Sequence, residues 1–395
     1  MTGTRHFIEV DHFQEKKFRQ MACGDIFLSQ KVDEGQRVIS VLADGLGSGI
    51  KAAVLANLTT TMAIKYVASD VDITRAASTI METLPVCKVR GIAYSTFTIV
   101  DMDRHGATRI VEYDNPSFVL LRDGNVVEVP KDIVPIMTSN DRETLLHVSS
   151  FMVHPGDRIV IFSDGVIQAG VGQGASPLGW GSQAVNAYLE QVVKDRPTIS
   201  GRQLARNLVH RALAQDNFKA KDDISCGVIY YRKPREVLVF TGAPVKKERD
   251  IELAEAALAF EGKKIICGGT TASILSRELG RALLMDLSDL DPSIPPVSHM
   301  EGFELVTEGA ITLAALARML EQEENPDLLR PNAVTRLAGV LLDSDIIHFK
   351  VGTKINEALQ DPSLPESLDI RRNIIRHLQK TLSERFLKEV HVSFV

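Results

Sequence analysis

Acidic residues stand where strongly apolar runs begin or end in the first half of the chain. They are Asp25 in CGDIFL, Asp44 after RVISVLA, Asp164 after RIVIFS, and Asp222 before DISCGVIYY. Carboxylates that a fold brings together repel one another and lose hydration, so they need a compensating charge. Carboxylate and backbone carbonyl oxygens are ligands that suit Mg²⁺ or Mn²⁺. The pattern therefore favours a fold whose strand ends bind divalent cations.

Glycine follows two of these aspartates, as Gly45 and Gly165, and lets the backbone bend so that its carbonyl can also face a metal. A lone Asp-Gly pair is most often a simple turn, and Asp123-Gly124 is interpreted here as a hairpin turn. Order, spacing and position at strand ends together distinguish the other aspartates from such turns.

The first half of the chain reads as strand-like and helix-like segments in separate blocks. Apolar runs bounded by turn signals predict strands at residues 37–44, 93–103, 108–114, 117–124, 125–130, 157–165 and 226–232. Helical spacing predicts helices at residues 50–66 and 73–84, and further helical segments up to about residue 214. Meander strands flanked by helix pairs indicate an antiparallel sheet packed on helices.

The pattern of predicted elements changes in the second half, after a short polar linker at residues 232–236. Strands are predicted at 237–242, 263–269, 303–309, 345–353 and the C-terminal VHVSFV, and they alternate with helices at 250–260, 270–280, 311–322 and through 370–386. This alternation predicts an α/β domain with an at least partly parallel sheet. We expect domains at residues 1–234 and 235–395.

Composition excludes several classes of protein. The net charge is −6, and neither half carries a basic surplus, which argues against binding to nucleic acid or to a membrane surface. The sequence begins without an apolar leader, and no apolar run reaches the roughly 18 residues of a membrane helix. Widely spaced cysteines predict neither a zinc site nor a disulfide framework. They are Cys23, Cys87, Cys226 and Cys267. We expect a cytoplasmic protein.

Motifs across residues 5–232 resemble, in order, those of the metal-dependent protein phosphatases (PPM family), in their stage II sporulation protein E (SpoIIE)-like bacterial branch. The matching stretches are CGD (23–25), ADGLGSGIKAA (43–53), IAYSTFTIVDMD (92–103), YDNPSFVLLRDG (113–124), HPGDRIVIFSDGVIQAG (154–170) and KDDISCGVI (221–229). Each motif alone is weak, but their common order is specific. The resemblance implies an αββα sandwich, in which two mostly antiparallel sheets lie between helix pairs, followed here by the smaller α/β domain.

The resemblance also implies a site and an activity. Two Mn²⁺ or Mg²⁺ ions would be bridged by Asp44, with Asp164 and Asp222 completing one metal, the Gly45 carbonyl binding the other, and Asp25 holding metal-bound water. A water activated by both metals would hydrolyse phosphoserine or phosphothreonine in a phosphoprotein substrate. Asp223 aligns with a position that more often supports the site than binds metal.

Some positions depart from the family pattern without removing a metal ligand. Gln168 replaces a common glutamate, Asn115-Pro116 replaces a Gly-His-Pro turn, and no arginine clearly grips phosphate. Arg19, Lys51 and Arg90 are candidates for that contact, although solvated surface charge is the commoner use of such residues. We therefore expect an active enzyme. The alternatives are a catalytically weak, partner-switching phosphatase fold and a bifunctional protein whose C-terminal domain binds a phosphometabolite.

A glycine-rich loop follows an expected strand of the second half, at Gly268, Gly269, Thr270 and Thr271. Glycines and hydroxyls at a helix N-terminus can bind a small anionic ligand, and ligands of α/β sheets lie at the carboxyl ends of strands. Helix capping by Thr270 or Thr271 is the commoner use of this pattern. The loop matches neither a P-loop nor a dinucleotide-binding fingerprint. Oligomerisation stays open.

Overall fold

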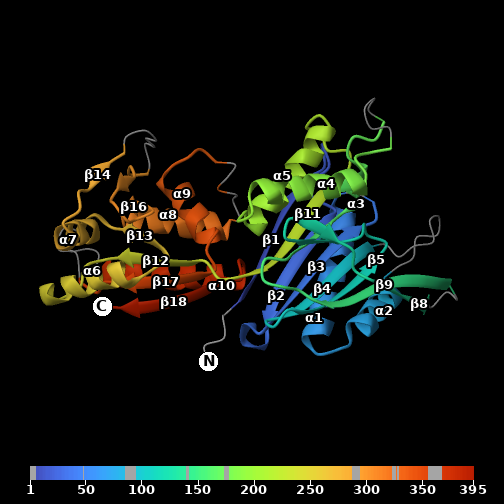
Figure 1. Cartoon of the computed structure of the whole chain (residues 1–395), viewed down its shortest axis with the longest axis horizontal. Coiled ribbons are helices and arrows are strands. Elements are labelled where there is room, and N and C mark those ends of the chain that lie inside the picture. Colours follow the sequence, from blue (N-terminus) through green and yellow to red (C-terminus); the bar gives the residue numbers. More distant parts are fainter. Residues whose placement is uncertain are drawn as a thin grey trace. The chain divides into compact units, whose positions relative to one another are not determined.

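The computed structural model describes residues 6–47, 49–84, 95–138, 142–172, 178–286, 294–322, 326, 329–354 and 367–395. The chain divides into two compact units, residues 1–233 and 234–395 (Figure 1). Cys87, Arg90 and the start of the IAYST motif lie outside the described residues. No helix in the described ranges is long and apolar enough to cross a bilayer.

Two antiparallel sheets form the centre of the first unit. One has the strand order β1-β11-β10-β6-β7, and the other has the order β2-β3-β4-β5-β9-β8. The strands are β1 Phe7–Glu15, β2 Asp25–Val32, β3 Arg37–Gly45, β4 Ser95–Asp103, β5 Ala107–Tyr113, β6 Val119–Arg122, β7 Asn125–Val127, β8 Asp132–Thr138, β9 Arg142–Met152, β10 Arg158–Phe162 and β11 Ile224–Arg232. The first strand of the chain therefore pairs with the last strand of the unit.

Helix pairs cover the outer faces of both sheets. Apolar residues of α1 (Ile50–Ala68) and α2 (Ile73–Thr83) pack on the six-stranded sheet. Those of α4 (Ser182–Asp195) and α5 (Gly201–Gln215) pack on the five-stranded sheet. Figure 1 shows the two pairs on opposite sides of the paired sheets. This arrangement confirms the αββα sandwich expected from the sequence.

Alternation along β3 decides which residues face the other sheet. Ile39, Val41 and Ala43 belong to the core beneath α1 and α2. Because successive side chains of a strand point to opposite faces, Leu42 and Asp44 point toward the five-stranded sheet. The sequence thus ends an apolar strand with a carboxylate on the inner face of the sandwich.

One mixed sheet of order β14-β15-β16-β13-β12-β17-β18 forms the second unit. The strands are β12 Glu236–Thr241, β13 Lys263–Cys267, β14 Leu284–Met285, β15 Ser298–His299, β16 Leu305–Thr307, β17 Ile346–Val351 and β18 Glu389–Phe394. Strands β16, β13, β12, β17 and β18 run parallel, while β14 and β15 add antiparallel pairs at one edge. The prediction of an α/β fold with a partly parallel sheet is confirmed.

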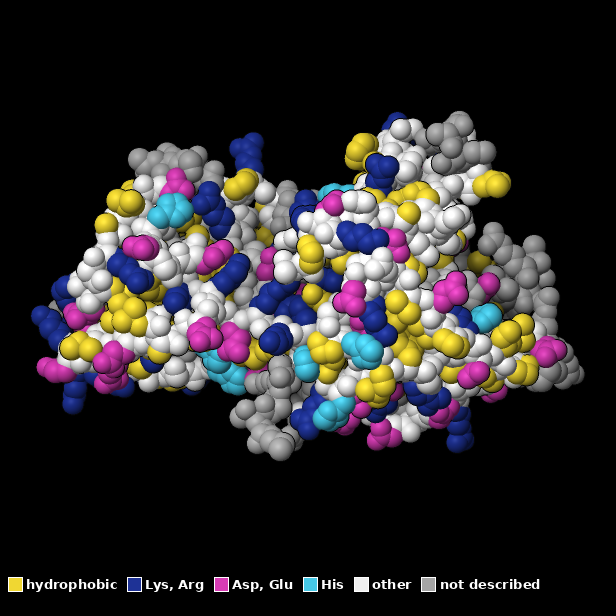
Figure 2. All heavy atoms as spheres, viewed as in Figure 1, with side chains coloured by type: hydrophobic (Ala, Val, Ile, Leu, Met, Phe, Trp, Pro, Cys, Tyr) yellow, Lys and Arg dark blue, Asp and Glu magenta, His cyan; other side chains and the backbone are white. Residues whose placement is uncertain are grey.

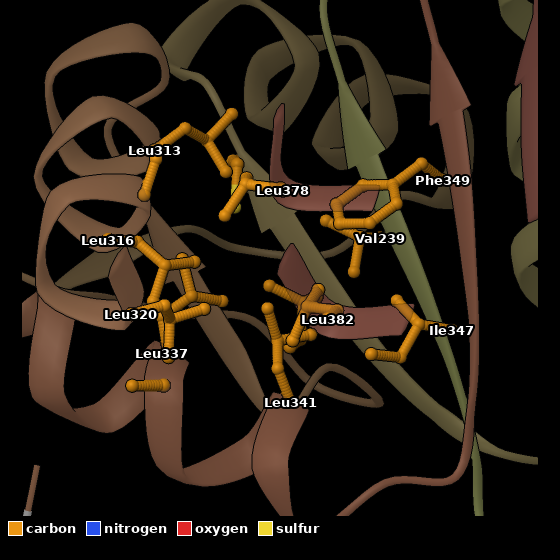
Figure 3. Close-up of a cluster of buried hydrophobic side chains, with 14 of the residues drawn as sticks. Val239, Leu313, Leu316, Leu320, Leu337, Leu341, Ile347, Phe349, Leu378 and Leu382 are labelled. Atoms are coloured by element: carbon orange, nitrogen blue, oxygen red, sulfur yellow. The ribbon is translucent and has the colours of Figure 1, made fainter. Parts of the chain in front are cut away.

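Helices cover both faces of this sheet. Helices α6 (Asp250–Ala259) and α7 (Gly269–Leu279) pack on one face through the core that contains Phe240. Helices α8 (Ala310–Glu321), α9 (Ala333–Leu342) and α10 (Ser367–Glu384) pack on the other. Figure 3 shows part of the second core, where leucines of these three helices gather beside Val239, Ile347 and Phe349.

Several elements escape the sequence patterns. Strands β1, β2, β8 and β9 and helix α9 were not among the predicted elements. Strand β1 contains Glu9, which is buried because its carboxylate forms an ion pair with Arg232 of β11. An acidic residue at an inward position breaks the alternation that identifies a half-buried strand, and its partner lies more than two hundred residues away.

Candidate functional site

Two of the predicted site residues lie directly opposite each other. Asp25 begins β2, Asp44 lies near the end of β3, and the antiparallel register pairs them. Asp25 is 1% exposed, and neither of its carboxylate oxygens has a hydrogen-bond partner in the described part of the chain. A buried carboxylate without a partner is costly, so Asp25 is an acceptor that the protein alone leaves unsatisfied.

Asp164 comes from the five-stranded sheet and lies at the same edge of the sandwich as Asp25 and Asp44. We call this edge, with Asp222 and Asp223, the acidic edge. Asp164 is the first residue of the short helix α3 (Asp164–Gln168), which follows β10 through Ser163. The Gln168 side-chain amide donates a 2.7 Å hydrogen bond to Asp164 Oδ2. The glutamine that departs from the family pattern therefore holds the candidate ligand without adding a negative charge.

Asp222 and Asp223 immediately precede β11, the central neighbour of β10. The side chain of Asp222 is 41% exposed and lies 3.4 Å from Lys17 Nζ. Asp223 is buried, and its Oδ1 accepts a 2.9 Å hydrogen bond from the Lys17 backbone amide. The more accessible of the two carboxylates is thus the one that the sequence proposed as a ligand.

The electrostatics show that these carboxylates share one neighbourhood. Burial raises the pKa of Asp44 to about 9, and the charges of Asp25, Asp164, Asp222 and Asp223 add to the rise. Because each of these charges acts on Asp44, the structure gathers all the predicted acidic residues around it.

The pKa of Asp25 responds to the same surroundings. Burial raises it to about 7, and Asp223 and Asp164 contribute in the same direction. The Ser225 and Ser163 hydroxyls act against this rise, although neither completes a hydrogen bond to the carboxylate. Burial, Asp25 and Asp223 also raise the pKa of the Cys23 thiol, which keeps that thiol protonated.

Two glycines bring the backbone close at this edge. A β-carbon at Gly45 would lie 2.1 Å from the Ala52 carbonyl oxygen in the first turn of α1. A β-carbon at Gly165 would lie equally close to the carbonyl oxygen of Asp223, at 2.1 Å. Both positions exclude any side chain, so each Asp-Gly pair has a packing requirement that a surface turn lacks.

The Asp123-Gly124 pair behaves as expected for a turn. It connects β6 to β7, and both residues have positive φ, 50° and 75°. Asn115, which replaces part of a family turn, accepts a 2.6 Å hydrogen bond from Thr96 Oγ1 and donates a 3.2 Å bond to Thr98 Oγ1. These contacts fix the Asn115 turn to β4.

The donor set fits hard divalent cations. The candidate ligands are oxygens only, they repel one another, and Asp25 has buried acceptors that no residue in the described ranges satisfies. Within the described ranges, no group of three or more His, Cys, Asp or Glu side chains is arranged to hold a metal as it stands. The present contact of Asp222 with Lys17 would be the one that cation binding rearranges.

Residues near this edge that the sequence did not single out are Lys17 and Gln14. The Gln14 side-chain amide donates to the Asp25 carbonyl oxygen at 3.1 Å and to Ser225 Oγ at 3.0 Å. Neither residue has a motif signal, because the chain reaches the edge through the pairing of β1 with β11. Of the phosphate candidates, Arg19 lies over the Phe18 ring and Lys51 is exposed.

The glycine-rich loop of the second unit lies at the start of α7. Gly268 is the N-cap residue, and no side chain caps the helix. The preferred interpretation of Thr270 or Thr271 as a capping residue is therefore wrong. On the face drawn in Figure 2, Lys and Arg side chains are interspersed with Asp and Glu over both units.

Comparison with known proteins gives a family match and several similar solved structures. A sequence model of the stage II sporulation protein E (SpoIIE) family matches residues 34–232. The phosphatase domain of SpoIIE from Bacillus subtilis is a similar solved structure, with 17% identity and a TM-score of 0.45 over 58% of this chain and 95% of that one. The S. agalactiae serine/threonine phosphatase has 14% identity and a TM-score of 0.39 over 57% and 99%. RsbX in complex with magnesium has 16% identity and a TM-score of 0.40 over 56% and 94%. Curated proteins give no match.

Proposed function

Because the chain belongs to the stage II sporulation protein E (SpoIIE) family, we propose that residues 1–234 form a metal-dependent protein phosphatase. Its substrates are phosphoserine and phosphothreonine in a phosphoprotein. The observation that carries the proposal is the concentration of carboxylates around Asp44: burial raises the pKa of that residue to about 9, and the charges of the neighbouring carboxylates add to the rise. A fold that keeps such repulsion has a use for cations at this place.

The candidate ligands divide between the two sheets. From the six-stranded sheet, Asp44 and the Gly45 carbonyl would hold the cations. From the five-stranded sheet, Asp164 and Asp222 would complete one cation. When bound, two divalent cations lower the pKa of a water molecule and offset charge on the transferring phosphoryl group.

The other residues of this edge position the ligands. Asp25, whose oxygens have no partner in the described part of the chain, would accept hydrogen bonds from water at the cations. Gln168 orients Asp164 through its 2.7 Å bond, and the buried Asp223 fixes the Lys17 backbone beside Asp222. Lys17 thereby places a cationic side chain at the edge where a phosphate ester would enter.

The test is hydrolysis of para-nitrophenyl phosphate and of a phosphothreonine peptide by the full chain, with Mn²⁺ or with EDTA. Wild type is expected to turn over both substrates only with Mn²⁺, and Asp164→Asn is expected to lose this activity. Asp123→Asn is the matched control, since that residue precedes a glycine in a hairpin turn and asparagine tolerates its positive φ.

The outcomes separate this proposal from its competitor. Mn²⁺-dependent turnover that survives in Asp123→Asn and is lost in Asp164→Asn supports a phosphatase. Equal inactivity of wild type with and without Mn²⁺, together with absence of Mn²⁺ binding by calorimetry, would contradict it and favour a phosphatase fold that acts by binding a partner.

A further inference from the structure

The parallel strands of the second unit have the spatial order β16-β13-β12-β17-β18, which in chain order is third, second, first, fourth and fifth. After β12, the chain adds β13 and then β16 on one side of that strand. It then returns to the other side of β12 with β17 and β18. In open α/β sheets of this kind, ligands bind outside the carboxyl ends of the strands where the order reverses. Here that position lies after Thr241 of β12 and Val351 of β17.

Four glycine-containing loops meet at this end of the sheet. A β-carbon at Gly352 would lie 2.3 Å from the Ala243 carbonyl oxygen, so the loops after β12 and β17 are in contact. A β-carbon at Gly309, after β16, would lie 3.3 Å from the Gly268 Cα, after β13. The loops therefore pack backbone against backbone along the carboxyl ends of neighbouring strands, which glycine permits because it has no side chain.

Buried hydroxyls without partners gather at the same end. Thr241 and Thr271 are 0% and 1% exposed, and neither hydroxyl has a hydrogen-bond partner among the described residues. Thr271 Oγ1 lies under the glycine loop, 3.3 Å from the β-carbon position of Gly268. Thr312, in the first turn of α8, is a third buried hydroxyl of this kind. Buried polar groups are normally satisfied, so these hydroxyls indicate a ligand.

The N-terminus of α7 adds donors. This helix has 11 residues and no side-chain cap, and Gly269 and Thr270 in its first turn are exposed. Its first amides can therefore donate to an anion. At the neighbouring α8, by contrast, Glu308 Oε2 accepts a 3.2 Å hydrogen bond from the Ile311 amide, so the protein supplies its own carboxylate there.

A guanidinium completes the set of donors. Arg371 of α10 lies over the meeting point of the loops, with Nη1 2.5 Å from the β-carbon position of Gly242 and 3.4 Å from the Gly352 carbonyl oxygen. No carboxylate of the described chain forms an ion pair with it. Burial lowers the pKa of Arg371, and Glu308 opposes that shift without pairing with it. A partly buried cation without a carboxylate partner among the described residues is stabilised by an anionic ligand.

We propose that the carboxyl end of this sheet binds a small phosphate-bearing ligand, with the phosphate on the α7 amides, the Thr271 hydroxyl and Arg371. The loop lacks the lysine of a P-loop, so amides, hydroxyls and one guanidinium supply all donors. Thr241 lies beside the phosphate position at the end of β12. The inference rests on the second unit alone and stands independently of phosphatase activity.

Removing an unsatisfied hydroxyl gives the first test. Thr271→Val and Thr241→Val replace each hydroxyl by a methyl group of similar size. Because an unpartnered buried hydroxyl stabilises nothing in the ligand-free state, both variants are expected to melt at or above the wild-type temperature. A melting temperature below wild type in both variants would show that the hydroxyls serve the protein itself and would overturn the proposal.

Ligand binding gives the second test, with inorganic phosphate and AMP as probes of the full chain in EDTA. EDTA removes cations from the acidic edge, so that edge repels both probes. Wild type is expected to bind at least one probe in calorimetry, and Thr271→Val and Arg371→Gln are each expected to bind it about tenfold more weakly. Arg376→Gln, which removes an equal charge at an exposed position of α10, is expected to change the affinity less than twofold.

The possible results either support or overturn the proposed ligand site. Binding that depends on Thr271 and Arg371, and that persists in Asp44→Asn, supports the site and excludes uptake at the acidic edge. Absence of binding of both probes at about ten millimolar, or equal weakening by Arg376→Gln, overturns it. Circular dichroism of each variant confirms that the comparison is made on folded protein.

Discussion

The acidic edge of the first unit and the carboxyl end of the second sheet are built from opposite kinds of unsatisfied group. At the acidic edge, Asp25 has two buried acceptor oxygens without partners among the described residues, beside carboxylates that repel one another. At the other site, Thr241 and Thr271 leave buried hydroxyls beside open amides and the guanidinium of Arg371. Surplus acceptors suit a cation and surplus donors suit an anion, so the local imbalance indicates the ligand class at each place.

The substitution Asp44→Asn is expected to have the largest effect, and it acts on the acidic edge alone. Mn²⁺-dependent hydrolysis of para-nitrophenyl phosphate is expected to fall about a thousandfold, or ~4 kcal/mol, because the proposed metal ligand is lost. The same change should raise the melting temperature in EDTA, since it removes a carboxyl group whose ionisation is opposed by burial and by the neighbouring charges. Turnover within tenfold of wild type would remove Asp44 from the proposed site. Asp123→Asn serves as control.

Gly45→Ala and Gly269→Ala test how tightly the backbone is packed at the two sites. A β-carbon at Gly45 would meet the Ala52 carbonyl oxygen at 2.1 Å, so alanine is expected to cost about 2–3 kcal/mol of unfolding free energy. No atom lies within 4 Å of a β-carbon at Gly269, so alanine there should be neutral or stabilise α7 by up to about 1 kcal/mol. Urea denaturation measures both, and equal costs would contradict this reading.

Gln168→Ala tests the positioning of Asp164. Loss of the 2.7 Å hydrogen bond is expected to weaken Mn²⁺ binding about tenfold, with turnover at saturating Mn²⁺ little changed. Gln191→Ala is a matched control, because Gln191 donates a 2.8 Å bond to Asp195 four residues along α4. If both variants have the same Mn²⁺ affinity as wild type, Gln168 has no positioning role.

The smallest expected effect is the change in the free energy of unfolding with pH. The pKa of Asp44 is raised to about 9 and that of Asp25 to about 7, so above their ordinary pKa of about 4 the folded state binds more protons than the unfolded state. The free energy of unfolding therefore falls as pH rises through this window. In EDTA, the melting temperature of the full chain is expected to drop by a few degrees between about pH 5 and pH 9.

Two controls complete the pH experiment. Asp44→Asn should show a shallower drop, since one of the two raised groups is gone. The donors proposed for the second unit include hydroxyls and backbone amides that do not titrate in this range, so Thr271→Val should leave the slope unchanged. A melting temperature that rises with pH in EDTA would contradict the proposed clustering of carboxylates.

The sequence by itself determined the fold class and the candidate acidic residues. Apolar runs that end in Asp-Gly, in the order of a known family, were sufficient to predict the sandwich and to select Asp25, Asp44, Asp164 and Asp222, because strand ends and hydrophobic periodicity are local properties of the chain. Strand β1 was missed, because Glu9 breaks its pattern and is compensated only by Arg232 from β11. Lys17 was missed for the same reason, since its place beside Asp222 follows from that strand pairing.

Only the tertiary structure decided how these residues combine. The register of β2 with β3 sets Asp25 against Asp44, and burial together with the neighbouring charges produces the raised pKa values. In the second unit, the sequence favoured helix capping at the Gly268 loop, whereas the strand order brings Thr241, Thr271 and Arg371 to one end of the sheet. Solvation and charge depend on groups distant in the chain, so a local pattern can nominate a polar residue but cannot show whether its hydrogen bonds are satisfied.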